Sequence, residues 1–257
     1  MTKKALVTGA SRGIGRGIAL RLSKIGYDVA FTYHSEEDDA ISLKQEIEAL
    51  GQRCFYYQAT LQDDGVAEDI TAQAIKDLGG LDVLICNAGK TTFTSILTLE
   101  KSTIDFLYNL NYRSYLMCTK VAVNHMIENK IAGRIIYISS TRSMRAYRKD
   151  AIYGSLKSAL NRAVESIALE LAEYGITINS IAPGATAVRN DYTIEALQSG
   201  HISSLIPLKR KGKPDDVAGL VAYLISEDGS YITGETIKVD GGLILYGPNE
   251  DPNGGIF

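Results

Sequence analysis

The chain has 257 residues, 45% of them hydrophobic, and a formal net charge of -3. A chain of this length can bury one large core, so we expect a single domain. Charges of both signs are spread along it, which argues against nucleic acid or a membrane as a partner and favours a small-molecule substrate.

The cysteines and the N-terminus give expectations about the cell compartment. Cys54, Cys86 and Cys118 lie far apart, without the spacing of a metal site or a disulfide framework. We therefore expect no metal site and three buried thiols in a reducing compartment. No apolar run approaches the roughly 18 residues of a membrane helix, and a strand-like run follows Met1 too closely for a signal peptide. A cytoplasmic location is the expectation.

Short apolar runs that are typical of buried strands recur along the chain. They lie at residues 4–8, 28–32, 53–58, 82–86, 134–139, 177–181 and 236–240. Amphipathic stretches long enough to be helices separate most of them. In residues 40–51, for example, the pattern predicts Ile41, Leu43, Ile47 and Leu50 facing inward, with Gly51 as the stop.

This alternation of strand and helix predicts a particular fold. Parallel strands need crossover connections, so the sheet should be covered by helices on both faces. We predict an α/β fold with a seven-stranded, doubly wound parallel sheet of the Rossmann type, in one domain over residues 1–257. Residues 247–257 are rich in Gly, Pro and Asn, and disorder is one interpretation of this tail.

A glycine-rich stretch, TGASRGIG, joins the first predicted strand to the following helix. Gly9 permits a tight turn, Gly13 lets the backbone approach a pyrophosphate, and Gly15 permits close packing. The helix N-terminus adds amide donors and a positive dipole. The position therefore indicates a dinucleotide site.

Tyr153 and Lys157 lie four residues apart on a predicted helix. This spacing places their Cβ atoms about 5 to 6 Å apart on one face. A nearby ammonium lowers the pKa of a phenol, which would let Tyr153 exchange a proton with a carbinol or carbonyl oxygen. By itself the motif is better interpreted as an ordinary surface pair on a helix.

The motifs taken together resemble those of the short-chain dehydrogenase/reductase family. In chain order they are the glycine turn, Asn87-Ala88-Gly89, Asn111, Ser139-Ser140, Tyr153, Lys157 and Pro183-Gly184. The resemblance covers nearly the whole chain. Within the family, the chain is similar to 3-oxoacyl-acyl-carrier-protein reductases and glucose 1-dehydrogenases.

The resemblance implies four catalytic residues. Tyr153 would be the general acid/base, and Lys157 would hold the nicotinamide ribose and lower the tyrosine pKa. Ser140 would bind the substrate oxygen, and Asn111 would complete a proton relay. Ser140 is chosen over Ser139 because the serine of the family precedes its tyrosine by thirteen residues.

The glycine turn and the resemblance also assign the cofactor contacts. These are Gly9, Ser11, Arg12, Gly13, Ile14, Gly15, Tyr33, His34, Ser35, Thr60, Leu61, Asn87, Ala88, Gly89, Tyr153, Lys157, Pro183, Gly184 and Thr186. Thr60 stands where the family often has an aspartate that meets the adenine. Val188 stands where it commonly has a threonine, for which Thr186 could compensate.

The residues after the second strand favour NADP(H) over NAD(H). An enzyme that uses NAD places a carboxylate there for the ribose, whereas this chain has Tyr33, His34 and Ser35. With Arg12 these side chains suit a 2′-phosphate. The acidic residues 36–39 come slightly later, and they would either stabilise the next helix or reach the ribose.

The expected function is reduction of a ketone or 3-oxoacyl substrate, or oxidation of the corresponding alcohol. Alternatives are an NAD-preferring sugar or polyol dehydrogenase and a non-catalytic, cofactor-binding regulator or scaffold. Arg142, Arg145, Arg148 and Lys149 would either bind an anionic substrate or form a solvated loop.

The resemblance further implies a homotetramer built on helices near residues 102–129 and 153–174. Their apolar residues Leu116, Val121, Leu169 and Leu171 would serve either that interface or the core. The tail at 243–257 would then cover a site of a neighbouring subunit.

Overall fold

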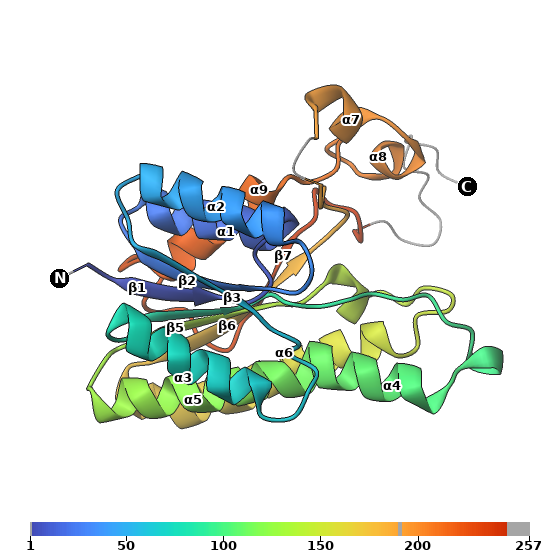
Figure 1. Ribbon diagram of the computed structural model, residues 1–257. Helices are drawn as coiled ribbons and strands as arrows, with labels where there is room; N and C mark the ends of the chain where they lie inside the picture. The colour runs from blue at the N-terminus through green and yellow to red at the C-terminus, as the bar shows by residue number, and fades with distance from the viewer. Residues whose placement is uncertain (1, 190–191, 246–257) are drawn as a thin grey trace.

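The computed structural model describes residues 2–189 and 192–245, and its central feature is a seven-stranded sheet in the order β3-β2-β1-β4-β5-β6-β7 (Figure 1). All paired strands are parallel. The strands are β1 (Lys4–Val7), β2 (Asp28–Tyr33), β3 (Cys54–Gln58), β4 (Val83–Cys86), β5 (Arg134–Ile138), β6 (Thr177–Pro183) and β7 (Thr236–Val239). The predicted Rossmann-type sheet is confirmed.

Helices cover both faces of this sheet (Figure 1). The longer helices are α1 (Gly13–Lys24), α2 (Glu37–Ala49), α3 (Val66–Leu78), α4 (Lys101–Tyr108), α5 (Ser114–Glu128), α6 (Tyr153–Leu171) and α9 (Pro214–Leu224). Two short helices, α7 (Ile194–Gln198) and α8 (His201–Leu205), precede α9. Short 3-10 turns occupy Ile96–Thr98, Thr141–Ser143 and Ala172–Tyr174, and a π-helical turn, Asn109–Arg113, joins α4 to α5.

Two apolar cores form because side chains alternate along each strand. In β1, Ala5 and Val7 belong to the core under α1, α2 and α9, whereas Leu6 belongs to the core under α3, α5 and α6. Strands that are buried on both faces read as continuous apolar runs. This is why their positions could be predicted from the sequence.

The inward face of α2 differs from the prediction. The helix begins at Glu37, and its buried residues are Ala40, Leu43 and Ile47. The prediction that Ile41 and Leu50 face inward is wrong, since 36% and 41% of their surfaces are exposed. Ile41 lies about 100° around the helix from Ala40 and so leaves the buried face, and Leu50 is the C-cap, after the last helical residue.

The strand order places a crevice at one edge of the sheet. The chain moves outward from β1 to β2 and β3, then returns to pair β4 with the other side of β1. At such a reversal the loops after neighbouring strands diverge and leave a space at the carboxyl ends. The glycine turn after β1 and the Asn87 segment after β4 lie on its two sides.

Other expectations concern the cysteines and the tail. Cys54, Cys86 and Cys118 are buried and unpaired, as expected. No helix within the described residues has the length and apolar character to cross a membrane. Of the predicted tail, residues 246–257 lie outside the described residues.

Candidate active site

A cleft of about 1110 Å³ lies at the carboxyl ends of the central strands. Nearly all predicted site residues line it; the exceptions are Thr60 and Asn111. Its lining includes Gly9, Ser11, Arg12, Gly13, Ile14, Gly15, Tyr33, His34, Ser35, Leu61, Asn87, Ala88, Gly89, Ser140, Tyr153, Lys157, Pro183, Gly184 and Thr186. Residues that are far apart in sequence are thus brought to one cavity.

The glycine turn is built as a tight cradle at one end of the cleft. Gly9 has φ +67°, and a Cβ added at Gly15 would lie 2.3 Å from the carbonyl oxygen of Gly9. The side-chain amide nitrogen of Asn87 donates to the backbone carbonyl oxygens of Thr8 and Gly9, at 3.0 and 2.7 Å. Only glycine fits where backbone meets backbone so closely, and the turn is fixed from the β4 side.

The start of α1 fits the pyrophosphate of a dinucleotide. The N-cap residue Arg12 is extended, and its side chain makes no capping hydrogen bond. Amide groups at such a helix start attract phosphate, and no acidic residue occupies the first turn of α1. The glycine cradle leaves room for backbone to approach the ligand. These residues therefore fit the phosphates of a nicotinamide dinucleotide.

Beyond the end of β2, Arg12 meets a carboxylate. Its guanidinium lies 3.4 Å from Glu36, which also lines the cleft beside Ser35. Burial raises the pKa of Glu36, but Arg12 and hydrogen bonds of Ser35 outweigh this and leave the pKa lowered. A cation and an anion therefore share the place where the adenosine ribose would lie.

Tyr153 begins α6 and faces Ser140, which follows β5. Burial raises the pKa of Tyr153; Arg142 and a hydrogen bond from Ser140 oppose this, and Asp150 reinforces it. The overall shift is upward, so the prediction of a lowered pKa is not confirmed. Of the two cations over the ring of Tyr153, the guanidinium of Arg142 is the nearer, at 4.5 Å from the ring centroid, against 5.7 Å for the ammonium of Lys157.

The Lys157 ammonium is almost fully buried on the next turn of α6. It donates to the carbonyl oxygen of Ile138 at 2.8 Å and to the phenol oxygen of Tyr115 at 3.2 Å. Burial lowers the pKa of Lys157 to about 7. Part of the lysine population is therefore neutral near pH 7, which limits how far it can lower the pKa of Tyr153.

The two adjacent serines after β5 have different surroundings. The hydroxyl of Ser139 is buried and donates to the backbone carbonyl oxygen of Lys157 at 3.2 Å. The hydroxyl of Ser140 accepts from the amide of Arg142 at 3.2 Å and also reaches Tyr153. Ser139 thus holds α6, whereas Ser140 faces the cleft beside the phenol.

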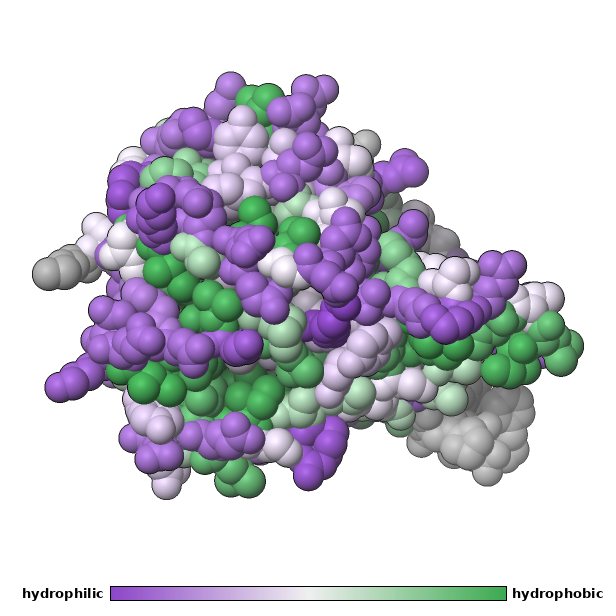
Figure 2. All heavy atoms as spheres, turned by 60° about the horizontal axis from the view of Figure 1, so that its bottom comes forward, coloured by the Kyte–Doolittle hydropathy of each residue, from purple (hydrophilic) through white to green (hydrophobic). Residues whose placement is uncertain are grey.

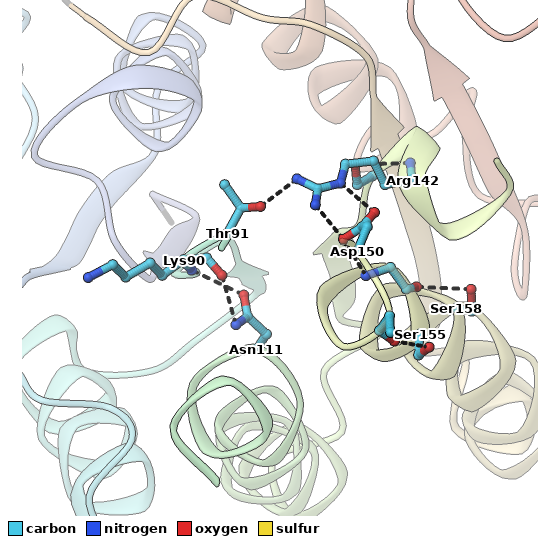
Figure 3. A network of polar contacts seen from close by, with 10 residues as sticks. Lys90, Thr91, Asn111, Arg142, Asp150, Ser155 and Ser158 are labelled. Atoms are coloured by element: carbon cyan, nitrogen blue, oxygen red, sulfur yellow. Dashed lines mark hydrogen bonds and ion pairs between the residues drawn. The ribbon is translucent and has the colours of Figure 1, made fainter. Parts of the chain in front are cut away.

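Asn111 is fully buried in the π-helical turn between α4 and α5. Its side-chain nitrogen donates to the carbonyl oxygen of Leu107 at 3.1 Å. The same nitrogen donates to the carbonyl oxygen of Lys90, and the side-chain oxygen accepts from the backbone amide of Lys90, both at 3.1 Å (Figure 3). The side chain therefore fixes the wall of the cleft after Gly89. It does not line the cleft itself.

Two substituted positions can also be located. Thr60 lies in the turn after β3. Its neighbours Ala59 and Leu61 line the cleft, whereas Thr60 does not. Val188 lines the cleft with 59% of its surface exposed, and the hydroxyl of Thr186 donates to the carbonyl oxygen of Gly184. A contact of Thr60 or Thr186 with a cofactor stays a prediction.

The sequence does not indicate Tyr115 as a site residue, because Tyr115 carries no motif and its partner Lys157 is 42 residues away. For Arg142 and Glu36 the sequence offers a site role as one of two alternatives, but it does not identify their partners. An aspartate eight residues after Arg142 is the one signal for its ion pair.

Within residues 2–189 and 192–245, no group of three or more His, Cys, Asp and Glu side chains is placed to hold a metal ion.

Comparison with known proteins gives a consistent class of enzyme. A family model described as enoyl-(acyl carrier protein) reductase matches residues 9–244. The 3-oxoacyl-acyl-carrier-protein reductase of Staphylococcus aureus is 36% identical over 95% of this chain and 99% of its own. A glucose 1-dehydrogenase of Gluconobacter oxydans is 34% identical over 97% of this chain and 94% of its own.

Solved structures agree with this. Acetoin dehydrogenase of Salmonella typhimurium superposes with a TM-score of 0.93 at 32% identity, covering 98% of this chain and 99% of its own. A short chain dehydrogenase of Burkholderia cenocepacia, in complex with NADP, has a TM-score of 0.85 at 34% identity, covering 94% and 97%. The printed names differ in substrate, so at these identities they leave the substrate open.

Proposed function

The chain belongs to the short-chain dehydrogenase/reductase family of oxidoreductases that act on carbonyl and alcohol groups, and we propose that it reduces a ketone or 3-oxoacyl-type carbonyl with NADPH. The observation that carries this proposal is the convergence of Ser140, Tyr153 and Lys157 on the same cleft as the glycine turn. When bound, the nicotinamide supplies the hydride.

In this proposal the phenol of Tyr153 gives a proton to the carbonyl oxygen during reduction and takes it back during alcohol oxidation. Ser140, already in contact with the phenol, binds the same substrate oxygen. Lys157 would hold the ribose with the donor capacity that its ammonium has beside its hydrogen bonds to Ile138 and Tyr115. Asn111 acts through the cleft wall at Lys90.

The preference for NADP(H) rests on the residues around Arg12. Arg12, Tyr33, His34 and Ser35 offer donors to a 2′-phosphate, and all of them line the cleft. The relative from Burkholderia cenocepacia in complex with NADP supports this proposal. Glu36 supports the alternative, an NAD-preferring sugar or polyol dehydrogenase, because a carboxylate at this place can accept from the ribose hydroxyls.

The basic loop supports a neutral substrate more than an anionic one. Of its four cations, Arg142 is the one that lines the cleft, and Asp150 compensates its charge. Arg145, Arg148 and Lys149 border a second hollow of about 670 Å³, which adjoins the cleft at Arg142. An anionic substrate would have to reach that hollow as well as Tyr153.

Assembly and location are also part of the proposal. We expect one domain over residues 1–257, a homotetramer and a cytoplasmic location.

Apolar side chains are exposed on the helical face that carries α3 to α6 (Figure 2). Leu169 on α6 is 83% exposed, whereas Leu171 is in the core. On α4, Ile104 is 38% exposed and Tyr108 is 43% exposed. The exposed set supports contacts between subunits through these helices.

The test begins with the cofactor and ends with a substrate. Purified protein is titrated with NADPH and NADH in parallel, and nicotinamide fluorescence gives both dissociation constants. A panel of ketones, 3-oxoacyl thioesters, sugars and polyols is then run with the cofactor that binds more tightly, with turnover followed by nicotinamide absorbance. Tighter NADH binding with sugar oxidation would establish the alternative. Binding without any turnover would indicate a non-catalytic regulator.

A further inference from the structure

Arg142 is held between two aromatic rings beside the cleft. Its guanidinium carbon lies 4.5 Å from the centroid of the Tyr153 ring and 4.2 Å from that of the Phe93 ring. Phe93 comes from the segment after β4, Arg142 from the turn after β5 and Tyr153 from α6. A guanidinium over a ring is attracted by the π-electron face, so the arrangement joins three separate segments.

Hydrogen bonds fix the plane of this guanidinium. Arg142 forms a bidentate pair with Asp150, in which Nε lies 2.6 Å from Oδ2 and Nη2 contacts Oδ1. Its remaining nitrogen, Nη1, donates to the hydroxyl of Thr91 (Figure 3). The side chains of Arg142 and Asp150 are only 14% and 2% exposed. A fork with all three nitrogens bonded has little freedom to leave the ring.

Asp150 also connects this pair to the helix that carries Tyr153. Its Oδ1 accepts from the amide of Gly154 at 3.2 Å, in the first turn of α6. A Cβ on Gly154 would lie 3.0 Å from the carbonyl oxygen of Arg142, so the turn and the helix are in close contact. The position of the guanidinium and the start of α6 are therefore set by one carboxylate.

The charges that face Tyr153 come from several elements. Arg142 favours its phenolate, Asp150 opposes this, and Lys157 lies on its own helix at 5.7 Å from the ring. Tyr115 is the other titratable neighbour, and burial raises its pKa well above 10, so that it stays neutral. Arg142 therefore brings a positive charge to the ring from outside the helix that carries Tyr153.

We propose that Arg142 is a positioning residue of the reaction, which holds the ring of Tyr153 by stacking and keeps a fixed positive charge beside it, with Asp150 and Thr91 as its supports. The role in turnover rests on the proposed function of Tyr153 as acid and base. The contact itself does not depend on that function.

The first experiment is an NMR titration of the protein labelled with ¹³C at the tyrosine ring, in which the Tyr153 resonance is assigned by its loss in Y153F. The variants are R142M, R142K, D150N and R142M/D150N. We expect the titration midpoint of Tyr153 to move to higher pH in R142M, and by less in the double variant, where the opposing carboxylate is also removed. R142K keeps the charge and should stay near the wild type. R210M is the matched control, because Arg210 forms a bidentate pair with Asp216, at 2.6 and 3.1 Å.

Unchanged midpoints in R142M and in the double variant would overturn the proposal. Loss of one partner from a buried ion pair can unfold a protein, and the double variant avoids this by leaving no uncompensated charge. If both fail to fold, D150N decides: the proposal requires its midpoint to fall, because the cation then acts unopposed, and an equal midpoint contradicts it.

Turnover separates this proposal from the proposed function. Alcohol oxidation requires the phenolate, so R142M should lower kcat at pH 7 by roughly three- to thirtyfold, with less change in KM. R142K should restore most of it. A shifted midpoint with unchanged turnover would support the contact of Arg142 with Tyr153 and contradict the role of Tyr153 as acid and base.

Discussion

The ammonium of Lys157 donates a hydrogen bond to the phenol oxygen of Tyr115, 3.2 Å away, in a part of the core where both side chains are buried. The Tyr115 phenol also lies 3.3 Å from the carbonyl oxygen of Ile138, which itself accepts from Lys157 at 2.8 Å. The phenol of Tyr115 and the carbonyl oxygen of Ile138, at the end of β5, therefore fix the position of the lysine that would hold the cofactor. A neutral phenol in this place stabilises the charged form of the lysine.

Replacement of Tyr115 by Phe should lower the activity of the enzyme while the fold is kept. The change removes one acceptor from a buried ammonium, which costs about 1 to 3 kcal/mol, so we expect kcat/KM to fall by roughly tenfold. The Lys157 pKa should fall below about 7. Steady-state kinetics between pH 6 and 9 measure both effects.

The control for Y115F is Y137F. Tyr137 is an equally buried phenol on β5, with hydrogen bonds to Thr119 at 2.6 Å and to the backbone oxygen of Tyr115 at 3.3 Å, and its ring packs edge-on against that of Tyr115. Y137F should lower the free energy of unfolding but leave the pH dependence of turnover unchanged. Equal losses in the two variants would mean that the phenol of Tyr115 has only a packing role.

The buried Lys157 should also make the stability of the protein depend on pH. Its pKa is lowered from 10.5 in the unfolded chain to about 7 by burial. Between about pH 7 and pH 10.5 the unfolded state thus binds one more proton at this site, and the free energy of unfolding rises with pH. We expect a gain on the order of 3 to 5 kcal/mol across this window in the wild type relative to K157M. Urea denaturation at pH 7, 8.5 and 10 tests this, and parallel curves for the two proteins would refute it.

The strands and the glycine turn were predictable because each depends on local sequence. A strand of a parallel sheet is buried on both sides and reads as an apolar run, and a turn that needs positive φ requires glycine at Gly9. The α2 face differs from the prediction because the apolar residues of this segment allow more than one helical face, and the contacts with the sheet select the one with Ala40, Leu43 and Ile47. Residues such as Tyr115 were missed because their function depends on a contact across the core.

The charge partners of the site were also hard to read from sequence. Arg142 looks like one of several cations in a surface loop, but folding buries it against Asp150 and the ring of Tyr153. Glu36 lies in an acidic run that suits a helix start, yet it pairs with Arg12 in the lining of the cleft. A sequence shows the sign of each charge, whereas its partner is set by the fold.

Replacement of Tyr153 by Phe should abolish turnover and leave cofactor binding nearly intact. The phenol oxygen is the group that would exchange the proton, and its loss should lower kcat by roughly 10² to 10⁴-fold. Y174F is the control, because Tyr174 is exposed at the end of the same helical segment. Nicotinamide fluorescence measures the binding. Wild-type turnover in Y153F would rule out the proposed mechanism.

Leu169 offers a test of the proposed assembly. It is 83% exposed on α6, so a charge there does not disturb the core, in contrast to Leu171, which is 5% exposed. If α6 packs against its copy, L169E should bury a charge in the interface and shift the protein to smaller species in sedimentation velocity. Tyr231, which is fully exposed, supplies the control variant Y231E. An unchanged sedimentation coefficient in L169E would place the interface elsewhere.

The Arg12 and Glu36 pair should decide between the two nicotinamide cofactors. A 2′-phosphate that binds Arg12 must compete with Glu36, whose carboxylate lies 3.4 Å from the guanidinium. Replacement of Arg12 by Glu should weaken NADPH by roughly 10- to 100-fold and NADH much less, since a charge-assisted hydrogen bond contributes about 1.5 to 3 kcal/mol. E36Q should act in the opposite direction, because it releases Arg12 and removes a carboxylate that repels the phosphate. Fluorescence titrations measure the dissociation constants of NADPH and NADH for R12E and E36Q, each compared with the wild type. If R12E weakens NADPH and NADH equally, Arg12 binds the pyrophosphate common to both, and the preference must come from Tyr33, His34 or Ser35.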